Sequence, residues 1–137
     1  MKLNFSISEL VKSDIAKKNN IENIPSLAQS DNILNLIFYV LQPIRNKINK
    51  KIIVTSGFRS PKVNFFCGGA INSNHLSGCA ADIIPDGRNF REIYDYVVNN
   101  LDYDECFIET NSKGIKWLHV AYRKNNNRKK HNSNYTV

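Results

Sequence analysis

The spacing of apolar residues in the first third of the chain predicts two helices. Residues 6–19 begin with a serine and a glutamate at capping-box spacing and continue with helical periodicity. Residues 33–48 carry an amphipathic apolar stripe, and either Ser30 or Asp31 can cap this second helix. Pro43 lies inside the stripe and lacks a backbone N–H, so we expect it to kink the helix or to restart it.

Further along the chain, short runs of β-branched residues alternate with helical segments. The stretch 111–114 between the last two runs has the composition of a hairpin turn. Asn89 is placed to cap the last helix. We expect strands at residues 51–55, 80–84, 105–110 and 115–121, and helices at residues 61–66 and 90–98.

This order of elements predicts an α+β domain with a small, mostly antiparallel sheet packed with N-terminal helices. The 137 residues, 42% of them hydrophobic, suit one compact domain with a core. We expect this domain at residues 1–123 and a basic polar tail at residues 124–137, solvated and partly disordered. Arg123 and Arg128 follow the final predicted strand and are interpreted as solvated cations rather than as ligands of a substrate carboxylate or phosphate.

The formal net charge of +7 favours anionic partners such as nucleic acid, cell-wall polymers or membrane surfaces. The chain carries no RNA-binding signature, no zinc-finger spacing and no basic patch interleaved with aromatic residues, so a specific nucleic-acid partner is not predicted. No apolar run approaches the ~20 residues of a membrane span. The N-terminal residues lack the apolar core and cleavage site of a secretory signal, which predicts synthesis in the cytoplasm without a signal peptide.

Three cysteines, Cys67, Cys79 and Cys106, are spread along the chain without CxxC spacing. An odd number in this arrangement argues against a disulfide framework or a thiolate zinc knuckle. We interpret them as small, mostly buried thiols. Because Cys79 lies beside the candidate metal ligands described next, a ligand or reactive role remains its alternative.

The stretch SNHLSGCAAD, residues 73–82, places His75 and Asp82 around very small side chains. Asp82 lies on a predicted strand and His75 in the loop before it, so the chain can fold back and bring the imidazole near the carboxylate. His119, flanked by apolar residues in WLHV, supplies a third group. Each histidine alone is more often structural, but a buried aspartate is costly unless it is paired or binds a metal. Two imidazoles and one carboxylate form the ligand set of a catalytic zinc site with a fourth position for water.

These motifs, in this order, resemble the superfamily of zinc D-Ala-D-Ala carboxypeptidases and peptidoglycan endopeptidases, which shares its fold with the hedgehog signalling domain. The chain is most similar to the compact single-domain branch found in phages and bacteria. The resemblance covers nearly the whole chain and is carried by NFSISELVKSDIAKKNNIENIPS, LQPIR, IIVTSGFRS, CGGAINSNHLSGCAADI and WLHVAYR.

The resemblance implies a role for each matching residue. His75, Asp82 and His119 correspond to the ligands of a Zn²⁺ ion. Arg59 corresponds to an arginine that meets a substrate carboxylate or carbonyl, as the rigid fork of a guanidinium suits. Ser73 lies in the loop that contacts the peptide.

The general base is a departure from the family pattern. Several branches place a glutamate three residues before the second metal histidine, where this chain has Lys116. We expect Glu109 to take the role, because it lies across the predicted hairpin from Lys116 and Trp117, although a register shift of one residue would turn it away. Asp104, Glu105 or no base at all are the alternatives.

The sequence therefore predicts a zinc metallopeptidase that cleaves peptidoglycan stem or cross-bridge peptides, as a D-Ala-D-Ala carboxypeptidase or an endolysin-type endopeptidase. It would act at the bacterial cell wall, as a phage lysin or as a virion component beside other virion proteins. The alternative is a catalytically inactive virion structural or cell-wall-binding module that retains the fold. A basic nucleic-acid binder is a third hypothesis, and no motif supports it.

Overall fold

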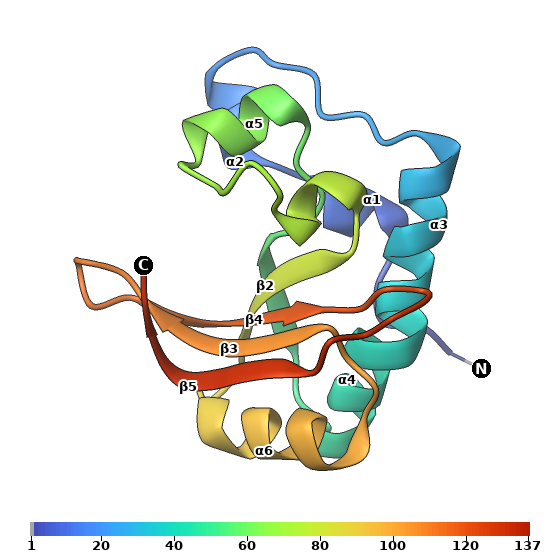
Figure 1. Cartoon of the computed structure of the whole chain (residues 1–137), viewed down its shortest axis with the longest axis vertical. Helices are drawn as coiled ribbons and strands as arrows, with labels where there is room; N and C mark the ends of the chain where they lie inside the picture. Colours follow the sequence, from blue (N-terminus) through green and yellow to red (C-terminus); the bar gives the residue numbers. More distant parts are fainter. Residues whose placement is uncertain (1) are drawn as a thin grey trace.

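A mixed sheet of five strands runs through the middle of the computed structural model, which describes residues 2–137 (Figure 1). Its strand order is β1-β2-β4-β3-β5, and every neighbouring pair is antiparallel except β3 and β5. The prediction of an α+β domain with a mostly antiparallel sheet is therefore confirmed. The strands are β1 Ile52–Ser56, β2 Ala80–Pro85, β3 Glu105–Thr110, β4 Lys116–Ala121 and β5 Lys130–Thr136.

Helices surround this sheet and bury one continuous apolar core against it. Leu10, Leu36 and Leu118 are fully buried in that core, which joins the N-terminal helices to the strands. In Figure 1 the last helix, α6, lies along one side of the sheet, while α5 and α2 lie together at the opposite end of the molecule. The α-helices are α1 Ile7–Val11, α2 Asp14–Lys18, α3 Leu27–Leu36, α4 Gln42–Ile48, α5 Pro61–Phe66 and α6 Phe90–Asn100.

The first helix begins as predicted, with the Ser6 hydroxyl accepting a hydrogen bond from Glu9 N at 3.2 Å, but the helical segments after it differ from the prediction. Residues 6–19 form two short helices instead of one, because Ser13 is extended and its side chain accepts a hydrogen bond from Ala16 N, which starts a second helix. The next helix starts after Ser26, not at Ser30 or Asp31. Ser26 forms a complete capping box with its third helical residue, which satisfies two backbone N–H groups at the helix start.

Pro43 restarts a helix, as predicted. A π-helical turn, Ile37–Leu41, follows α3 directly, and α4 begins at Gln42 with Pro43 in its first turn. Proline lacks the N–H that would continue the α-helical pattern here, which fits the wider π-helical turn directly before it. The stripe thus stays continuous, and most of its apolar residues lie in the core, while Leu34 is exposed.

The C-terminal segment differs from the expectation of a partly disordered end. Residues 130–136 form β5, which pairs in parallel with β3 in a register that places Lys130 opposite Glu105. Lys130 N donates to Asp104 O at 3.0 Å, and Val137 N donates to Thr110 O at 3.0 Å. The segment is ordered because β3 offers it a row of backbone partners, which a hydrophobicity pattern does not reveal. In residues 2–137, no helix has the length and apolar character needed to cross a membrane.

Candidate metal centre

The three predicted metal ligands converge in the structure. His75 Nε2 lies 3.3 Å from Asp82 Oδ1, and His119 Nδ1 lies 2.9 Å from the same oxygen. The three candidate ligand atoms all lie within 4.8 Å of one another. All three residues are buried, with 3%, 6% and 7% of their surfaces exposed. Within residues 2–137 this is the one cluster of its kind, and no cysteine belongs to it.

Local structure explains why these side chains meet. Asp82 on β2 is directly opposite His119 on β4 in the antiparallel register. His75 lies in a short 3₁₀ helix, η2 (Asn74–Ser77), whose start is capped by Ser73. Gly78 ends that helix with φ +79°, a left-handed conformation that favours glycine, and the chain turns from there into β2.

Residues 57–59 connect the candidate ligand His75 to the N-terminal helix α1. Gly57 O accepts a hydrogen bond from His75 Nδ1 at 2.7 Å, and Arg59 N donates to His75 O at 3.0 Å. Phe58 N donates to Leu10 O at 2.7 Å. A Cβ atom at position 57 would lie 2.1 Å from Leu10 O, so only glycine fits between α1 and the histidine.

The hydrogen bonds of the two imidazoles fit a bound cation. His75 Nδ1 must donate to the carbonyl of Gly57, which leaves the Nε2 lone pair facing Asp82. His119 Nε2 lies 2.9 Å from Glu105 Oε1, and a proton on Nε2 leaves the Nδ1 lone pair facing Asp82 as well. Three acceptor atoms then face one point. Such carboxylate- and carbonyl-supported histidines are the usual arrangement around zinc.

Without a metal, protons compensate the buried charges. Burial lowers the pKa of His75. Burial opposes charge on His119 too, but its hydrogen bonds to Asp82 and Glu105 outweigh burial and raise its pKa to about 10. For Asp82, burial is likewise outweighed by the neighbouring imidazoles, which hold the pKa of its carboxyl well below the usual range. A metal that binds here at neutral pH therefore displaces the second proton of His119.

Arg59 contacts Asp82, one of the three candidate ligands. Its Nη2 lies 3.2 Å from Asp82 Oδ2, while Nε donates to Ser56 and Nη1 to Asn64. This contact holds the outer carboxylate oxygen and leaves Oδ1 turned toward the histidines. Arg59 also lines the cavity over the cluster, with 13% of its side chain exposed.

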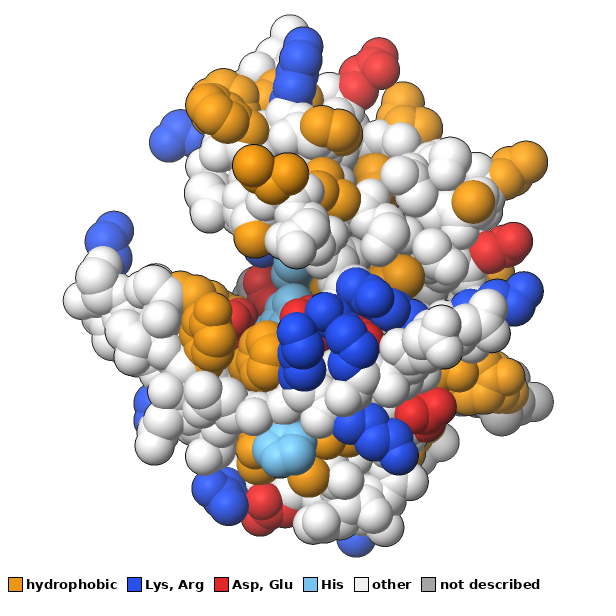
Figure 2. Space-filling view, viewed as in Figure 1, with side chains coloured by type: hydrophobic (Ala, Val, Ile, Leu, Met, Phe, Trp, Pro, Cys, Tyr) orange, Lys and Arg blue, Asp and Glu red, His pale blue; other side chains and the backbone are white. Residues whose placement is uncertain are grey.

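An open cleft of about 690 Å³ lies over the cluster. Figure 2 shows it as a hollow with pale blue histidine and red acidic side chains inside and blue cationic side chains beside them. Ser73 stands on its wall, where its hydroxyl accepts from His75 N. The buried cluster is thus reachable from solvent on one side, which a catalytic metal requires.

Two glutamates on β3 face the cleft in different environments. Glu109 pairs with Trp117 across the hairpin, and Oε1 accepts from Trp117 Nε1 at 2.7 Å. The register prediction is therefore confirmed, and burial raises the pKa of Glu109. For Glu105, burial is outweighed by its hydrogen bonds from His119 and Asn74, so its pKa is lowered. Lys116 is exposed.

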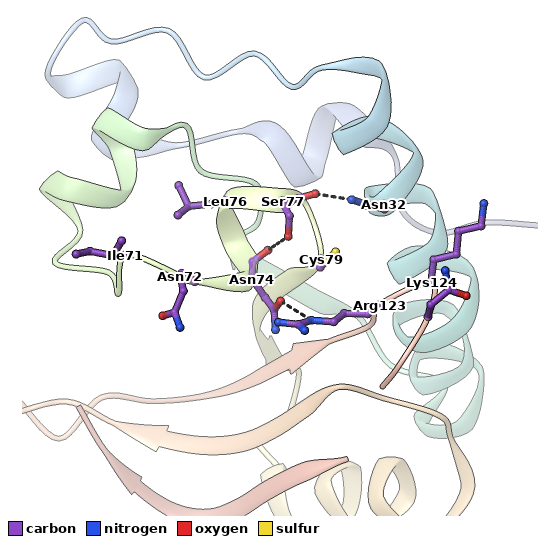
Figure 3. Close-up of a pocket in the computed structure, with 11 residues that line it drawn as sticks. Asn32, Ile71, Asn72, Asn74, Leu76, Ser77, Cys79, Arg123 and Lys124 are labelled. Atoms are coloured by element: carbon purple, nitrogen blue, oxygen red, sulfur yellow. Dashed lines mark hydrogen bonds between the residues drawn. The ribbon is translucent and has the colours of Figure 1, made fainter. Parts of the chain in front are cut away.

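A polar network that the sequence did not reveal lies behind Glu105. Asp104 is fully buried and binds Arg128 through Nε at 3.0 Å and Nη2 at 2.6 Å. Asn74 Nδ2 donates to both Asp104 and Glu105 at 2.8 Å. Arg123 Nε lies 3.2 Å from Asp104 Oδ2 and donates to Asn74 Oδ1, beside a second cavity (Figure 3).

This network determines the state of Asp104. Burial opposes its charge, but the hydrogen bonds from Arg128 and Asn74 outweigh burial and hold the pKa of Asp104 at about 2. A carboxylate with so low a pKa and both oxygens engaged is poorly suited to accept a proton.

Of the cysteines, Cys79 and Cys106 are buried as expected, while Cys67 is exposed. Burial raises the pKa of Cys79, which opposes a reactive thiolate.

An α+β domain with a buried His-Asp-His cluster below an open cleft has the construction of a metallopeptidase. The family model described as Peptidase M15 matches residues 3–121, and the chain belongs to this family. Membership confirms the resemblance to the zinc D-Ala-D-Ala carboxypeptidases and indicates a metallopeptidase. A comparison with curated protein sequences finds no match. The matched residues end with β4, so β5 lies outside them.

Proposed function

We propose that the protein is a zinc-dependent peptidase that cleaves stem or cross-bridge peptides of peptidoglycan. The observation that carries the proposal is the convergence of His75, Asp82 and His119 below a cleft that Glu109 also lines, in a chain of the Peptidase M15 family. The net charge of +7 would draw the protein to anionic wall polymers. Its place of action would be the bacterial cell wall, as a phage lysin or virion component.

When bound by the three ligands, zinc supplies a Lewis acid that polarises a carbonyl and lowers the pKa of water. Glu109 accepts a proton from the attacking water while the oxygen of that water bonds to the scissile carbonyl carbon. The same proton then passes from Glu109 to the leaving amine as the C–N bond breaks. The raised pKa of Glu109 suits both transfers, and Trp117 holds its carboxylate in place.

The other polar groups of the cleft orient the candidate metal ligands and balance the charge of the site. Opposite pKa shifts on Glu105 and Glu109 separate their roles, since the one that stays ionised cannot serve as the acid. Glu105 instead orients His119 through Nε2. Arg59 orients Asp82, and its positive charge on the cleft wall favours the oxyanion that develops on the substrate.

The test is release of new amino groups or D-alanine from purified peptidoglycan. We expect release by the zinc-loaded protein, its loss with a chelator and its recovery when zinc is added back. Glu109→Gln should retain zinc and lower the rate about 10²- to 10⁴-fold, the usual contribution of a general base. Glu22→Gln, which changes an exposed glutamate in a loop, is the matched control and should leave the rate unchanged.

His75→Ala should lose both zinc and release, because it removes a ligand. If the wild-type protein binds zinc but releases no more than His75→Ala, the peptidase proposal is wrong. The inactive wall-binding or virion structural module is then the better description.

A further inference from the structure

The C-terminal segment, although outside the family-matched residues, builds one wall of the metal cleft. Arg128, Lys130 and Tyr135 all line the cavity over the cluster. Tyr135 stacks on Phe107 at 5.2 Å between ring centroids, and Phe107 stacks on His119 at 5.5 Å. The cleft of this protein is therefore incomplete without the segment that carries its two additional cations.

Arg128 is held rigidly by the buried carboxylate behind it. Asp104 Oδ1 accepts from both the backbone N and Nε of Arg128, at 2.9 and 3.0 Å, and Oδ2 accepts from Nη2 at 2.6 Å. A cation that is fixed in advance loses little further freedom when it binds a ligand. Among residues 2–137 its Nη1 has no hydrogen-bond partner, and 35% of the side chain is exposed. Two N–H donors thus remain for a ligand in the cleft.

Arg128 lies close to the metal cluster. Its Nη2 is 3.5 Å from Glu105 Oε2, and the other oxygen of that carboxylate lies 2.9 Å from His119 Nε2. One carboxylate and one imidazole therefore separate the guanidinium from the metal position. Since an extended residue spans about 3.5 Å, a group one or two residues from the scissile bond can reach Arg128.

Arg59, the candidate from the sequence, is less available for a ligand. Its Nε, Nη1 and Nη2 are all engaged, by Ser56, Asn64 and Asp82. Nη1 of Arg128 has no partner among the described residues, and in Figure 2 a group of cationic side chains lies directly beside the hollow. The free N–H groups on Nη1 can donate charge-assisted hydrogen bonds to a carboxylate.

We propose that Arg128, with Lys130 lining the same cavity, binds the free carboxylate that ends the peptide substrate beside the cleaved bond. The inference rests on the proposed peptidase function and specifies its substrate class as peptides with a free C-terminus. The protein then acts as a carboxypeptidase.

The experiment compares acetyl-L-lysyl-D-alanyl-D-alanine with the same peptide carrying a C-terminal amide. We expect the zinc-loaded wild-type protein to hydrolyse the acid with a kcat/KM about ten- to hundredfold above that of the amide, the effect of a charged hydrogen bond. Arg128→Gln should remove this preference by raising KM for the acid alone. Arg128→Lys keeps the positive charge but lacks the guanidinium N–H donors, so it should retain part of the preference for the acid.

Arg123→Gln is the matched control for structural damage. Arg123 also contacts Asp104, at 3.2 Å, but it lines the neighbouring cavity drawn in Figure 3 and not the metal cleft. Arg123→Gln removes one cationic partner of the Asp104 carboxylate, as Arg128→Gln does. It should leave the ratio of kcat/KM for the acid and amide peptides unchanged. Thermal unfolding of both variants shows whether their structural losses are comparable.

Calorimetric binding of the two peptides to Glu109→Gln separates the inference from the proposed function. Tighter binding of the acid, lost when Arg128→Gln is added, supports the carboxylate site even if the wild-type protein hydrolyses neither peptide. Hydrolysis without preference for the acid, or a preference that survives Arg128→Gln, overturns the inference and leaves the peptidase proposal standing. Absence of any acid preference in both binding and hydrolysis also overturns it.

Discussion

Two buried carboxylates, Asp82 and Asp104, lie on either side of Glu105 and differ in what surrounds them. Asp82 faces two imidazoles and one guanidinium, whereas Asp104 faces two guanidinium groups. An imidazole can release its proton in the pH range of a cell, but a guanidinium cannot. Only the surroundings of Asp82 can therefore exchange protons for a metal ion. The chemistry of the partners, more than burial itself, separates a metal centre from a structural ion pair.

The two regions are also connected. Asn74 donates to Asp104 and to Glu105, and Glu105 in turn holds His119. The permanent ion pair thus fixes the carboxylate that orients a metal ligand. Supporting groups of this kind commonly determine metal affinity nearly as much as the ligands do.

The largest expected effect comes from removal of a ligand. His119→Ala should weaken zinc binding by more than about a hundredfold, because ligands contribute more than the ten- to hundredfold typical of supporting residues. Zinc content after dialysis against a competing chelator measures the change. His131→Ala removes the third histidine, which is hydrogen-bonded to Tyr103 outside the cluster, and should retain zinc. Equal zinc in both variants would show that the cluster is not the metal site.

A smaller effect is expected from the shared carboxylate. Glu105→Gln keeps the shape of the side chain but removes its charge from His119 Nε2, so zinc should bind about ten- to hundredfold more weakly. Competition titration with a zinc-sensitive dye measures the affinity. Asp102→Asn, a change on an exposed carboxylate three positions earlier, should have no effect. If the zinc affinity of Glu105→Gln were unchanged, Glu105 would not connect the Asp104 ion pair to the metal site.

The ion pair between Asp104 and Arg128 contacts none of the three candidate ligands, so its loss should mainly lower the stability of the fold. Asp104→Asn should lower the free energy of unfolding by about 2 kcal/mol at neutral pH, since it breaks charged hydrogen bonds to Arg128. The folded-state pKa of Asp104 lies below its unfolded value, so its contribution is present above about pH 4 and is lost as pH falls toward about 2. Urea unfolding of both proteins at several pH values tests this, and a difference that persists at pH 2 would contradict it.

The smallest effect concerns the aromatic stack on the metal ligand. Tyr135→Ala removes one ring from the series that ends at His119 and should cost about 1 kcal/mol of stability. Asn134→Ala, at the neighbouring exposed position, is the control. Thermal unfolding distinguishes them, and equal melting temperatures would mean that β5 gains nothing from the stack.

The candidate metal ligands could be predicted because local rules place them. Strand alternation and small neighbours indicated where His75 and Asp82 would meet, and the hairpin register placed Glu109 opposite Trp117. Glu105 was weighed as a base, but its contact with His119 depends on the exact side-chain geometry of the cleft.

The residues that were missed depend on contacts between distant segments. The polar stretch 130–136 has no apolar alternation, so only its pairing with β3 makes it a strand. Arg128 looks like a solvated cation in sequence, because Asp104, which fixes it, is 24 residues away. Ser26 and Gln29 have the spacing of a capping box, but the apolar stripe begins only at residue 33, and the helix start was predicted close to the stripe.

Position 57 has a consequence for handling the protein. Leu10 O, Phe58 N and the Gly57 carbonyl that accepts from His75 form one short chain of contacts, so helix α1 supports the candidate metal site from behind. Trimming the first dozen residues to obtain a minimal catalytic fragment would remove that support. Affinity tags and fusion partners at this end therefore need a spacer, and a protease cut near residue 12 should weaken metal binding at the candidate site.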